Sequence, residues 1–387
     1  MNVCIIPTGD RSGQANLIHH YSKIGFKVYL PLHGTGGLDW KGIATWPALL
    51  TRSTKNQARR NIEIHGFNRK DNFVVLGRTL AGNFFGEDRF LLSEDNGPLY
   101  GNNDVTCELV DFERERIHVD LFHTLRGSDR TFKRSISFQE RYFPKAKWIT
   151  STIFSNHHLP GKRKPANVCK MLPANYDELY RELNCFDCYP SGFEFELLNV
   201  RSNSGEPRKG FASFNHNFKA RYPEDYKLLA ETNKLLKQHD IFIPNYGGNI
   251  SGQGADTKYH SGGPTGSLPT LSIREAANLN TRLKGIVVFK QADYGGGVIW
   301  YALMAGTPIV THQKYLDVTH AGRILTNGYN TAVVNTPEQA AEMIVRLNED
   351  AAFAKKLASG MQQTFRDIIT DEYWKKFRVF AERALAN

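Results

Sequence analysis

The segment from Gly285 to Thr311 constrains the fold of this chain more than any other. It opens with GIVVFKQ, a short β-branched and aromatic run that is typical of a strand buried on both faces of a parallel sheet. We expect a turn over 293–297, a helix over 297–305 and a second strand over 309–311. A Gly-Thr-Pro sequence separates this helix from the second strand, where glycine suits a helix end and proline cannot continue the helix. The segment therefore predicts a strand, turn, helix and strand unit.

Three consecutive glycines, Gly295, Gly296 and Gly297, stand where this turn meets the helix. Glycines allow a ligand to approach the backbone closely. The free N–H groups and the positive end of the helix dipole suit a phosphate. The glycines favour a phosphate site, although a Rossmann-like turn in an unrelated α/β protein would carry the same pattern.

The same segment resembles the donor-binding segment of GT-B glycosyltransferases. That family carries an acidic residue, a glycine-rich turn, a Glu and then Ala-Met-Ala-x-Gly-Thr-Pro. With Gly-Thr-Pro aligned, Asp293 takes the acidic position and Tyr301 takes the position of the Glu. The resemblance implies that Asp293 contacts the donor sugar and that the glycine N–H groups contact the phosphates. Tyr301 departs from the family, in which the Glu holds the ribose of the nucleotide.

The resemblance implies an α/β fold with two Rossmann-like domains and a cleft between them. The chain has 387 residues, which is enough for two hydrophobic cores. We expect an N-terminal acceptor-binding domain over 1–178, a linker over 179–208 and a C-terminal nucleotide-sugar-binding domain over 209–370. A final helix over 371–387 is expected to cross back onto the N-terminal domain.

The N-terminal half supplies candidates for the acceptor side. A strand is predicted to end at Leu121-Phe122, and polar residues follow it, where open α/β sheets bind ligands. An inverting glycosyl transfer needs a base for the acceptor proton, and His123 and Asp129 are the candidates. A hydrogen-bonded histidine at a strand end is an equally good interpretation of His123. Arg126 and Arg130 are the candidate acceptor contacts.

Further candidates belong to the donor side. Gly13 stands at the start of the first predicted helix, in a loop that faces the cleft in the resembled family. In that family a basic pair after the first strand of the second domain neutralises the leaving diphosphate, and Lys219 and Arg221 match it. An exposed pair at a helix start is the alternative for these two residues. Tyr246 and Gly247 follow the next predicted strand and complete the donor set.

The charge of the chain bears on its partner. The net charge is +10, and residues 1–185 carry 26 Lys and Arg against 19 Asp and Glu. A positive field attracts polyanions, so the first half permits a nucleic acid as partner. A solvated, lysine-rich surface explains the same excess equally well.

The sequence LFHTLR, over 121–126, is similar to a segment of phage DNA glucosyltransferases. This resemblance implies sugar transfer from a UDP-linked donor to a hydroxylated pyrimidine in phage DNA, which would be flipped out of the stack. One such enzyme type has a catalytic Asp after Leu-Phe-Thr, and its absence here directs attention to His123 and Asp129. Two alternatives stay open. One is a GT-B enzyme acting on a saccharide, lipid or protein, and the other is a non-catalytic nucleic-acid-binding protein on a degenerate GT-B fold.

The remaining sequence features concern location and metal use. No apolar run reaches the length of about 18 residues that a membrane span needs, and MNVCIIPTGD lacks the features of a secretory signal. Five irregularly spaced cysteines fit a reducing compartment. We therefore expect a cytoplasmic protein without a membrane partner, located in the bacterial host if it is phage-encoded. A helix dipole and basic residues can stabilise a diphosphate, so we expect no metal requirement.

Overall fold

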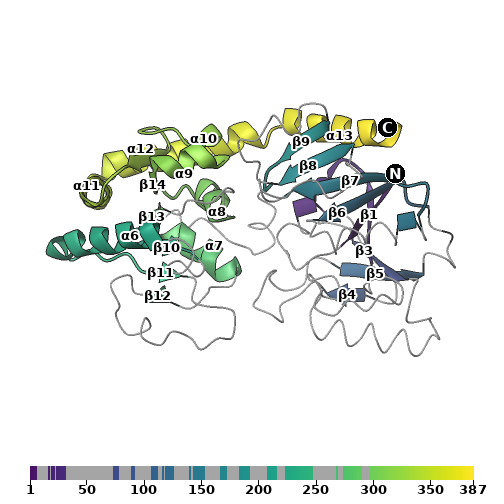
Figure 1. The fold of residues 1–387 in the computed structure, drawn as a ribbon. Helices are drawn as coiled ribbons and strands as arrows, with labels where there is room; N and C mark the ends of the chain where they lie inside the picture. Colours follow the sequence, from purple (N-terminus) through teal and green to yellow (C-terminus); the bar gives the residue numbers. More distant parts are fainter. Residues whose placement is uncertain are drawn as a thin grey trace. The chain divides into compact units, whose positions relative to one another are not determined.

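The computed structural model describes two compact parts of the chain. Unit 1 comprises Met1–Asn199 and Ile369–Asn387, and unit 2 comprises Val200–Ile368. Each unit is built on one β-sheet, in agreement with the predicted α/β class (Figure 1). The described residues are 1–6, 16–17, 19–21, 23–31, 73–77, 89–91, 106–111, 116, 118–125, 139–140, 143–152, 166–171, 183–191, 207–215, 223–246, 267–268, 273–289 and 297–387.

Unit 1 contains a nine-stranded sheet in the order β4-β5-β3-β2-β1-β6-β7-β8-β9. The six strands from β2 to β9 in this order pair in parallel, whereas β3, β5 and β4 form an antiparallel extension. The strands are β1 (Asn2–Ile6), β2 (Lys27–Pro31), β3 (Phe73–Gly77), β4 (Arg89–Leu91), β5 (Thr106–Asp111), β6 (Leu121–Leu125), β7 (Lys147–Thr152), β8 (Asn167–Met171) and β9 (Asn184–Cys188).

The last helix of the chain, α13 (Asp371–Ala386), packs on strands β9 and β7 of unit 1. Thr370 caps the helix by accepting a hydrogen bond from the N–H of Tyr373. Phe377 and Phe380 pack against Phe186 of β9, with ring centroids 5.0 and 5.7 Å away; the Phe380 ring is stacked and the Phe377 ring is tilted. Buried aromatic residues at helical spacing form the apolar stripe that holds α13 on the sheet.

The segment 179–208, which we expected to be a linker, contains strand β9. Phe186 and Cys188 are buried, whereas Asp187 between them is partly exposed. This alternation is typical of a strand with one face toward the interior. The segment is therefore not a linker throughout.

Unit 2 contains a six-stranded, fully parallel sheet in the order β12-β11-β10-β13-β14-β15. All four residues of β13 are buried, as the apolar run in the sequence predicts for a parallel strand with both faces covered. The strands are β10 (Phe211–Phe214), β11 (Asn245–Tyr246), β12 (Ser267–Leu268), β13 (Gly285–Val288), β14 (Ile309–His312) and β15 (Thr331–Val334).

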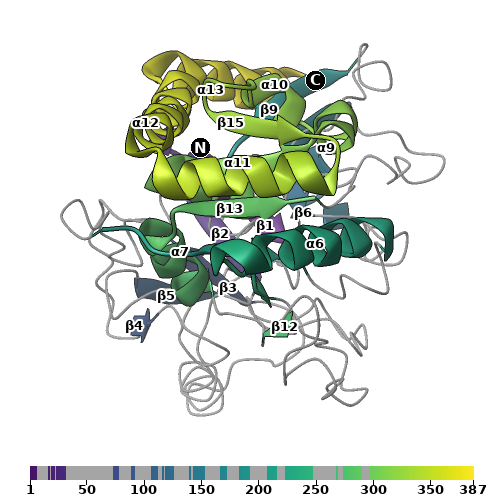
Figure 2. The same ribbon diagram turned by 90° about the vertical axis from the view of Figure 1, so that its left-hand side faces the viewer.

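The helices of unit 2 cover both faces of this sheet. Helices α6 and α11 lie on one face, and α7 and α8 lie on the other (Figures 1 and 2). The α6 and α11 side is filled by aliphatic residues such as Leu229, Val287 and Ile344. The helical elements are α6 (Pro223–Leu236), the 3-10 turn η2 (Lys237–His239), α7 (Ile273–Arg282), α8 (Gly297–Ala305), α9 (Gln313–Val318), α10 (Ala321–Ile324), α11 (Pro337–Glu349) and α12 (Ala351–Ile368).

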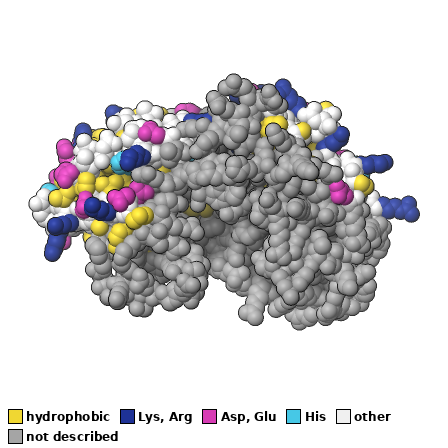
Figure 3. All heavy atoms as spheres, viewed as in Figure 1, with side chains coloured by type: hydrophobic (Ala, Val, Ile, Leu, Met, Phe, Trp, Pro, Cys, Tyr) yellow, Lys and Arg dark blue, Asp and Glu magenta, His cyan; other side chains and the backbone are white. Residues whose placement is uncertain are grey.

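The described surface of unit 2 carries both signs of charge. Figure 3 shows Lys and Arg side chains interspersed with Asp and Glu rather than gathered in one patch on this face. Helix α6 has Glu224 and Asp225 in its first turn and Lys234 in its last, an arrangement that complements the helix dipole. Within the described part of the chain, every helix is too short or too polar to cross a membrane.

Candidate functional site

The strand order of unit 2 marks one edge of its sheet as the candidate site. The chain proceeds from β10 to β11 on one side and from β13 to β14 on the other, so its direction reverses between β10 and β13. In open parallel sheets, ligands bind outside the carboxyl ends of the strands at such a switch point. Here those ends are Phe214 of β10 and Val288 of β13.

Helix α8 begins at this carboxyl edge, because it follows β13 and leads back to β14. Its first residue, Gly297, is exposed. Among the described residues, the nearest atoms to a Cβ built on Gly297 are ring carbons of Tyr301 at 3.9 Å. The first-turn N–H groups of a helix have no intrahelical partner and attract anions. Gly297 therefore lies where a phosphate could reach the backbone, and its role in donor binding stays a prediction.

Tyr301 lies one turn along α8, and its ring packs back toward Gly297. The residue is only 8% exposed. Most of α8 is buried, including Ile299 and Trp300, so the helix is enclosed rather than amphipathic. At this position the chain offers a phenolic hydroxyl where the resembled family has a carboxylate.

Tyr246 also lies at the carboxyl edge and is half-buried. It pairs in register with Phe214 of β10, and the two rings stack with centroids 5.6 Å apart and planes at 21°. Both residues are half-buried. A partly open aromatic pair is suited to stack on a planar ring such as a nucleobase.

Two buried asparagines that the sequence analysis did not select hold the ends of β10 and β11 together. The Asn215 N–H donates to Asn245 Oδ1 at 3.1 Å, and Asn245 Nδ2 donates to the Asn215 carbonyl at 3.1 Å. Asn215 Nδ2 also donates to Ser213 Oγ at 2.6 Å. Such satisfied buried networks fix the backbone where the chain leaves the sheet. The signal in the sequence is an Asn at the end of both FASFN and FIPN.

The structure places His123 inside unit 1, so the prediction that the strand ends at Leu121-Phe122 is wrong. His123 is the third residue of β6, between Ile5 of β1 and Ile149 of β7, and it is fully buried. The strand continues because its polar side chains find partners within the sheet.

Both ring nitrogens of His123 are engaged in this interior. Nδ1 lies 2.8 Å from the hydroxyl of Tyr21, and Nε2 lies 2.6 Å from Oγ of Ser151. Burial lowers the pKa of His123 to about 3, because the charged imidazolium is poorly solvated there. A general base needs a free nitrogen within reach of the acceptor hydroxyl. In this arrangement His123 is a hydrogen-bonded core residue, which is the alternative interpretation of the sequence.

The other predicted site residues share one property, which is that they lie outside the described part of the chain. They are Gly13, Arg126, Asp129, Arg130, Lys219, Arg221, Gly247, Asp293, Gly295 and Gly296. Their roles stay predictions. Among the described residues, His, Cys, Asp and Glu side chains form no group that could hold a metal ion.

The sequence matches no protein-family profile and no curated protein. Solved glycosyltransferase structures, in contrast, are similar over the whole chain. S. aureus TarM has 8% identity and a TM-score of 0.58, covering 100% of this chain and 99% of TarM. The DNA-modifying β-glucosyltransferase of phage T4 has 10% identity and a TM-score of 0.54, with both chains covered fully.

A third similar structure is the pneumococcal O-GlcNAc transferase GtfA, solved with UDP and GlcNAc. It has 11% identity and a TM-score of 0.51, covering 100% of this chain and 99% of GtfA. At such identities the similarity establishes a shared fold. The two-sheet α/β fold predicted from the sequence is confirmed.

Proposed function

Because the chain has the GT-B fold, we propose that it is a glycosyltransferase that uses a nucleotide-sugar donor. The observation that supports this most is the switch point of unit 2, where the start of α8 and the Tyr246–Phe214 pair share the carboxyl edge of the sheet. UDP is the favoured nucleotide, because the TarM and GtfA structures contain UDP.

The donor would be held by groups with distinct tasks. The N–H groups around Gly297 would bind the diphosphate, and Asp293 would accept hydrogen bonds from the sugar hydroxyls. Negative charge develops on the nucleoside diphosphate as it departs. Fixed cations stabilise this charge and so lower the activation barrier of the transfer. Lys219 and Arg221 are proposed for this task.

The acceptor is proposed to be a hydroxylated pyrimidine in phage DNA. The positive charge of residues 1–185 supports it, as does the structural similarity to the T4 β-glucosyltransferase, a DNA-modifying enzyme. A base within duplex DNA would have to be flipped out, at a cost of a few kcal/mol that phosphate contacts offset. The alternative is a saccharide, lipid or protein acceptor. TarM and GtfA have the same fold, so the fold by itself does not select DNA.

The geometry of His123 bears on the choice of base in an inverting reaction. Both of its ring nitrogens have hydrogen-bond partners in the core, so Asp129 is the candidate that we propose. The acceptor contacts are proposed to be Arg126 and Arg130.

The protein is proposed to act without a metal, and this part needs its own test because the T4 enzyme has been solved with UDP and Mn²⁺. Activity that persists in excess EDTA supports the proposal. Activity that disappears with EDTA and returns with Mn²⁺ contradicts it.

The transfer assay uses purified protein, hydroxymethylated or unmodified DNA, and a panel of UDP-sugars. The DNA is digested to nucleosides, whose masses are measured by mass spectrometry, and released UDP is measured in parallel. A sugar-sized mass gain on one hydroxylated base, lost in Asp293→Ala, is the expected result. UDP release without a mass gain would support the proposed UDP-sugar donor and contradict the proposed DNA acceptor. DNA binding with steep salt dependence and no UDP release would instead favour a non-catalytic binding protein.

A further inference from the structure

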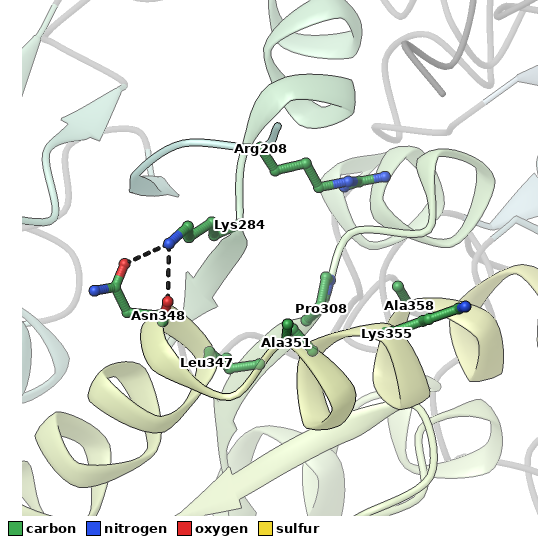
Figure 4. Close-up of a pocket in the computed structure, with 9 residues that line it drawn as sticks. Arg208, Lys284, Pro308, Leu347, Asn348, Ala351, Lys355 and Ala358 are labelled. Carbon is green, nitrogen blue, oxygen red and sulfur yellow. Dashed lines mark hydrogen bonds between the residues drawn. The ribbon is translucent and has the colours of Figure 1, made fainter. Parts of the chain in front are cut away.

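A cavity of about 370 Å³ opens at the amino edge of the sheet in unit 2, opposite the candidate donor site (Figure 4). Three lining residues mark this edge: Arg208, Lys284 and Pro308 come shortly before the starts of β10, β13 and β14. The other lining residues come from the end of α11 and from α12. They are Leu347, Asn348, Ala351, Ala354, Lys355 and Ala358.

The lining of this cavity is positive. Arg208, Lys284 and Lys355 contribute three cations, and the described lining residues include no acid. The nearby Asp350 is engaged elsewhere, because Oδ1 accepts from the Phe353 N–H at 2.9 Å and Oδ2 lies 3.6 Å from Nε of Arg346. Three cations around one cavity repel one another and create a positive potential inside it. An anion would therefore be attracted there.

The cations are positioned by the backbone and keep donors to spare. Arg208 donates through Nη1 to Thr307 Oγ1 at 2.8 Å and to the carbonyls of Leu283 and Asn280 at 3.2 and 3.5 Å, and through Nη2 to the carbonyl of Ala305 at 2.5 Å. Lys284 Nζ donates to the carbonyl and Oδ1 of Asn348 at 2.9 and 2.8 Å. A lysine has three N–H donors and an arginine has five, so each retains at least one. Lys355 is exposed, and in Figure 4 it extends in the same direction as Arg208.

The remaining wall is apolar and made of small residues. Ala351, Ala354 and Ala358 lie on one face of α12, and Pro308 and Leu347 complete the wall. The volume falls within the range of about 300–1,000 Å³ that small-molecule sites occupy. We propose that this cavity binds a small phosphate ester, with its phosphate between Arg208 and Lys355 and its apolar body against the alanines.

The test compares two neighbouring lysines of α12. Lys355 lines the cavity, whereas Lys356 is also exposed but does not line it. Inorganic phosphate and phenyl phosphate are titrated into the wild type, Lys355→Ala and Lys356→Ala by calorimetry, in parallel runs with and without UDP. We expect phenyl phosphate to bind more tightly than inorganic phosphate. Lys355→Ala should weaken both roughly tenfold, because one charge-assisted contact is lost, and Lys356→Ala should leave both unchanged.

A second pair of variants tests the same cavity with the opposite charge. Ala351→Glu would place a carboxylate in the cavity, and Ala352→Glu would place one beside it on the same exposed first turn of α12. Only Ala351→Glu should abolish phenyl phosphate binding. Equal affinities within both pairs, or no saturation by either probe at tens of millimolar, would overturn the proposal. Neither outcome depends on UDP binding, so failure of the glycosyltransferase proposal would be seen separately.

Discussion

The sheets of the two units differ in how their described strands satisfy buried polar side chains. In unit 2, Thr311 and Thr331 are buried, and each donates its hydroxyl to a backbone carbonyl of the neighbouring strand. In unit 1, the neighbouring strands β6 and β7 bury His123 and Ser151, which hydrogen-bond to each other. Every neighbouring strand offers backbone carbonyls, whereas a buried histidine needs particular side chains as its partners. The stability of unit 1 should therefore be sensitive to the loss of a single side chain of this network.

Removal of the imidazole at position 123 should have the largest effect. His123→Ala would leave a cavity and deprive the hydroxyls of Tyr21 and Ser151 of their partner, at a cost of about 3–5 kcal/mol in the free energy of unfolding. The control is His118→Ala, whose side chain is 67% exposed, and its effect should stay within about 0.5 kcal/mol. Chemical denaturation measures both. An active-site base would show the reverse pattern, with activity lost and stability kept.

Two glycines of unit 2 should differ in the same measurement. A Cβ on Gly360 would clash with the backbone oxygen of Tyr329, so Gly360→Ala should cost about 1–3 kcal/mol through overpacking. Gly297→Ala meets no such contact among the described residues and should change stability by less than about 0.5 kcal/mol. Equal losses in both variants would contradict this account of α12 packing.

The sequence predicts those elements correctly whose structure is decided by local pattern. The turn glycines and the Gly-Thr-Pro sequence placed α8 at Gly297–Ala305, the limits that the structure has. The environment of His123 could not be predicted from the sequence, because its partners Tyr21 and Ser151 lie 102 and 28 residues away in the chain. The Asn215–Asn245 pair was missed for the same reason, since its two members lie 30 residues apart, one just after β10 and the other in β11. Contacts of this range follow from the fold and not from local spacing.

Acid should lower the free energy of unfolding of both units, and that of unit 1 more than that of unit 2. Among the described histidines, burial lowers the pKa to about 3 for His19 and His123 in unit 1 and for His320 in unit 2. Between about pH 6.5 and this value the unfolded chain binds more protons, so stability falls as the pH falls. Each histidine contributes at most about 1.4 kcal/mol per pH unit. Hydrogen exchange at pH 7 and pH 5 resolves the two units, and equal protection at both pH values would contradict the prediction.

The smallest effect is expected at the hydrogen bonds that α13 makes with His20 and Tyr189 of unit 1. The hydroxyl of Tyr373 lies 2.7 Å from Nε2 of His20 and accepts from the Tyr189 N–H at 2.9 Å. Tyr373→Phe should cost about 1–1.5 kcal/mol and speed exchange of the Tyr189 amide. Tyr329→Phe, in which the parent residue is 43% exposed, is the control and should change neither. An unchanged Tyr189 amide in Tyr373→Phe would show that this hydrogen bond does not hold the helix.

The most direct test of the account is a calorimetric titration of UDP into the wild type, Gly297→Glu and Ala352→Glu. Both substitutions add one carboxylate near the start of a helix in unit 2, where negative charge does not oppose folding. Only Gly297→Glu would place it against the proposed diphosphate, where repulsion should weaken UDP binding by roughly tenfold or more. The account predicts one UDP site, lost in Gly297→Glu and kept in Ala352→Glu. Equal binding by both variants, or no binding by the wild type, would contradict it.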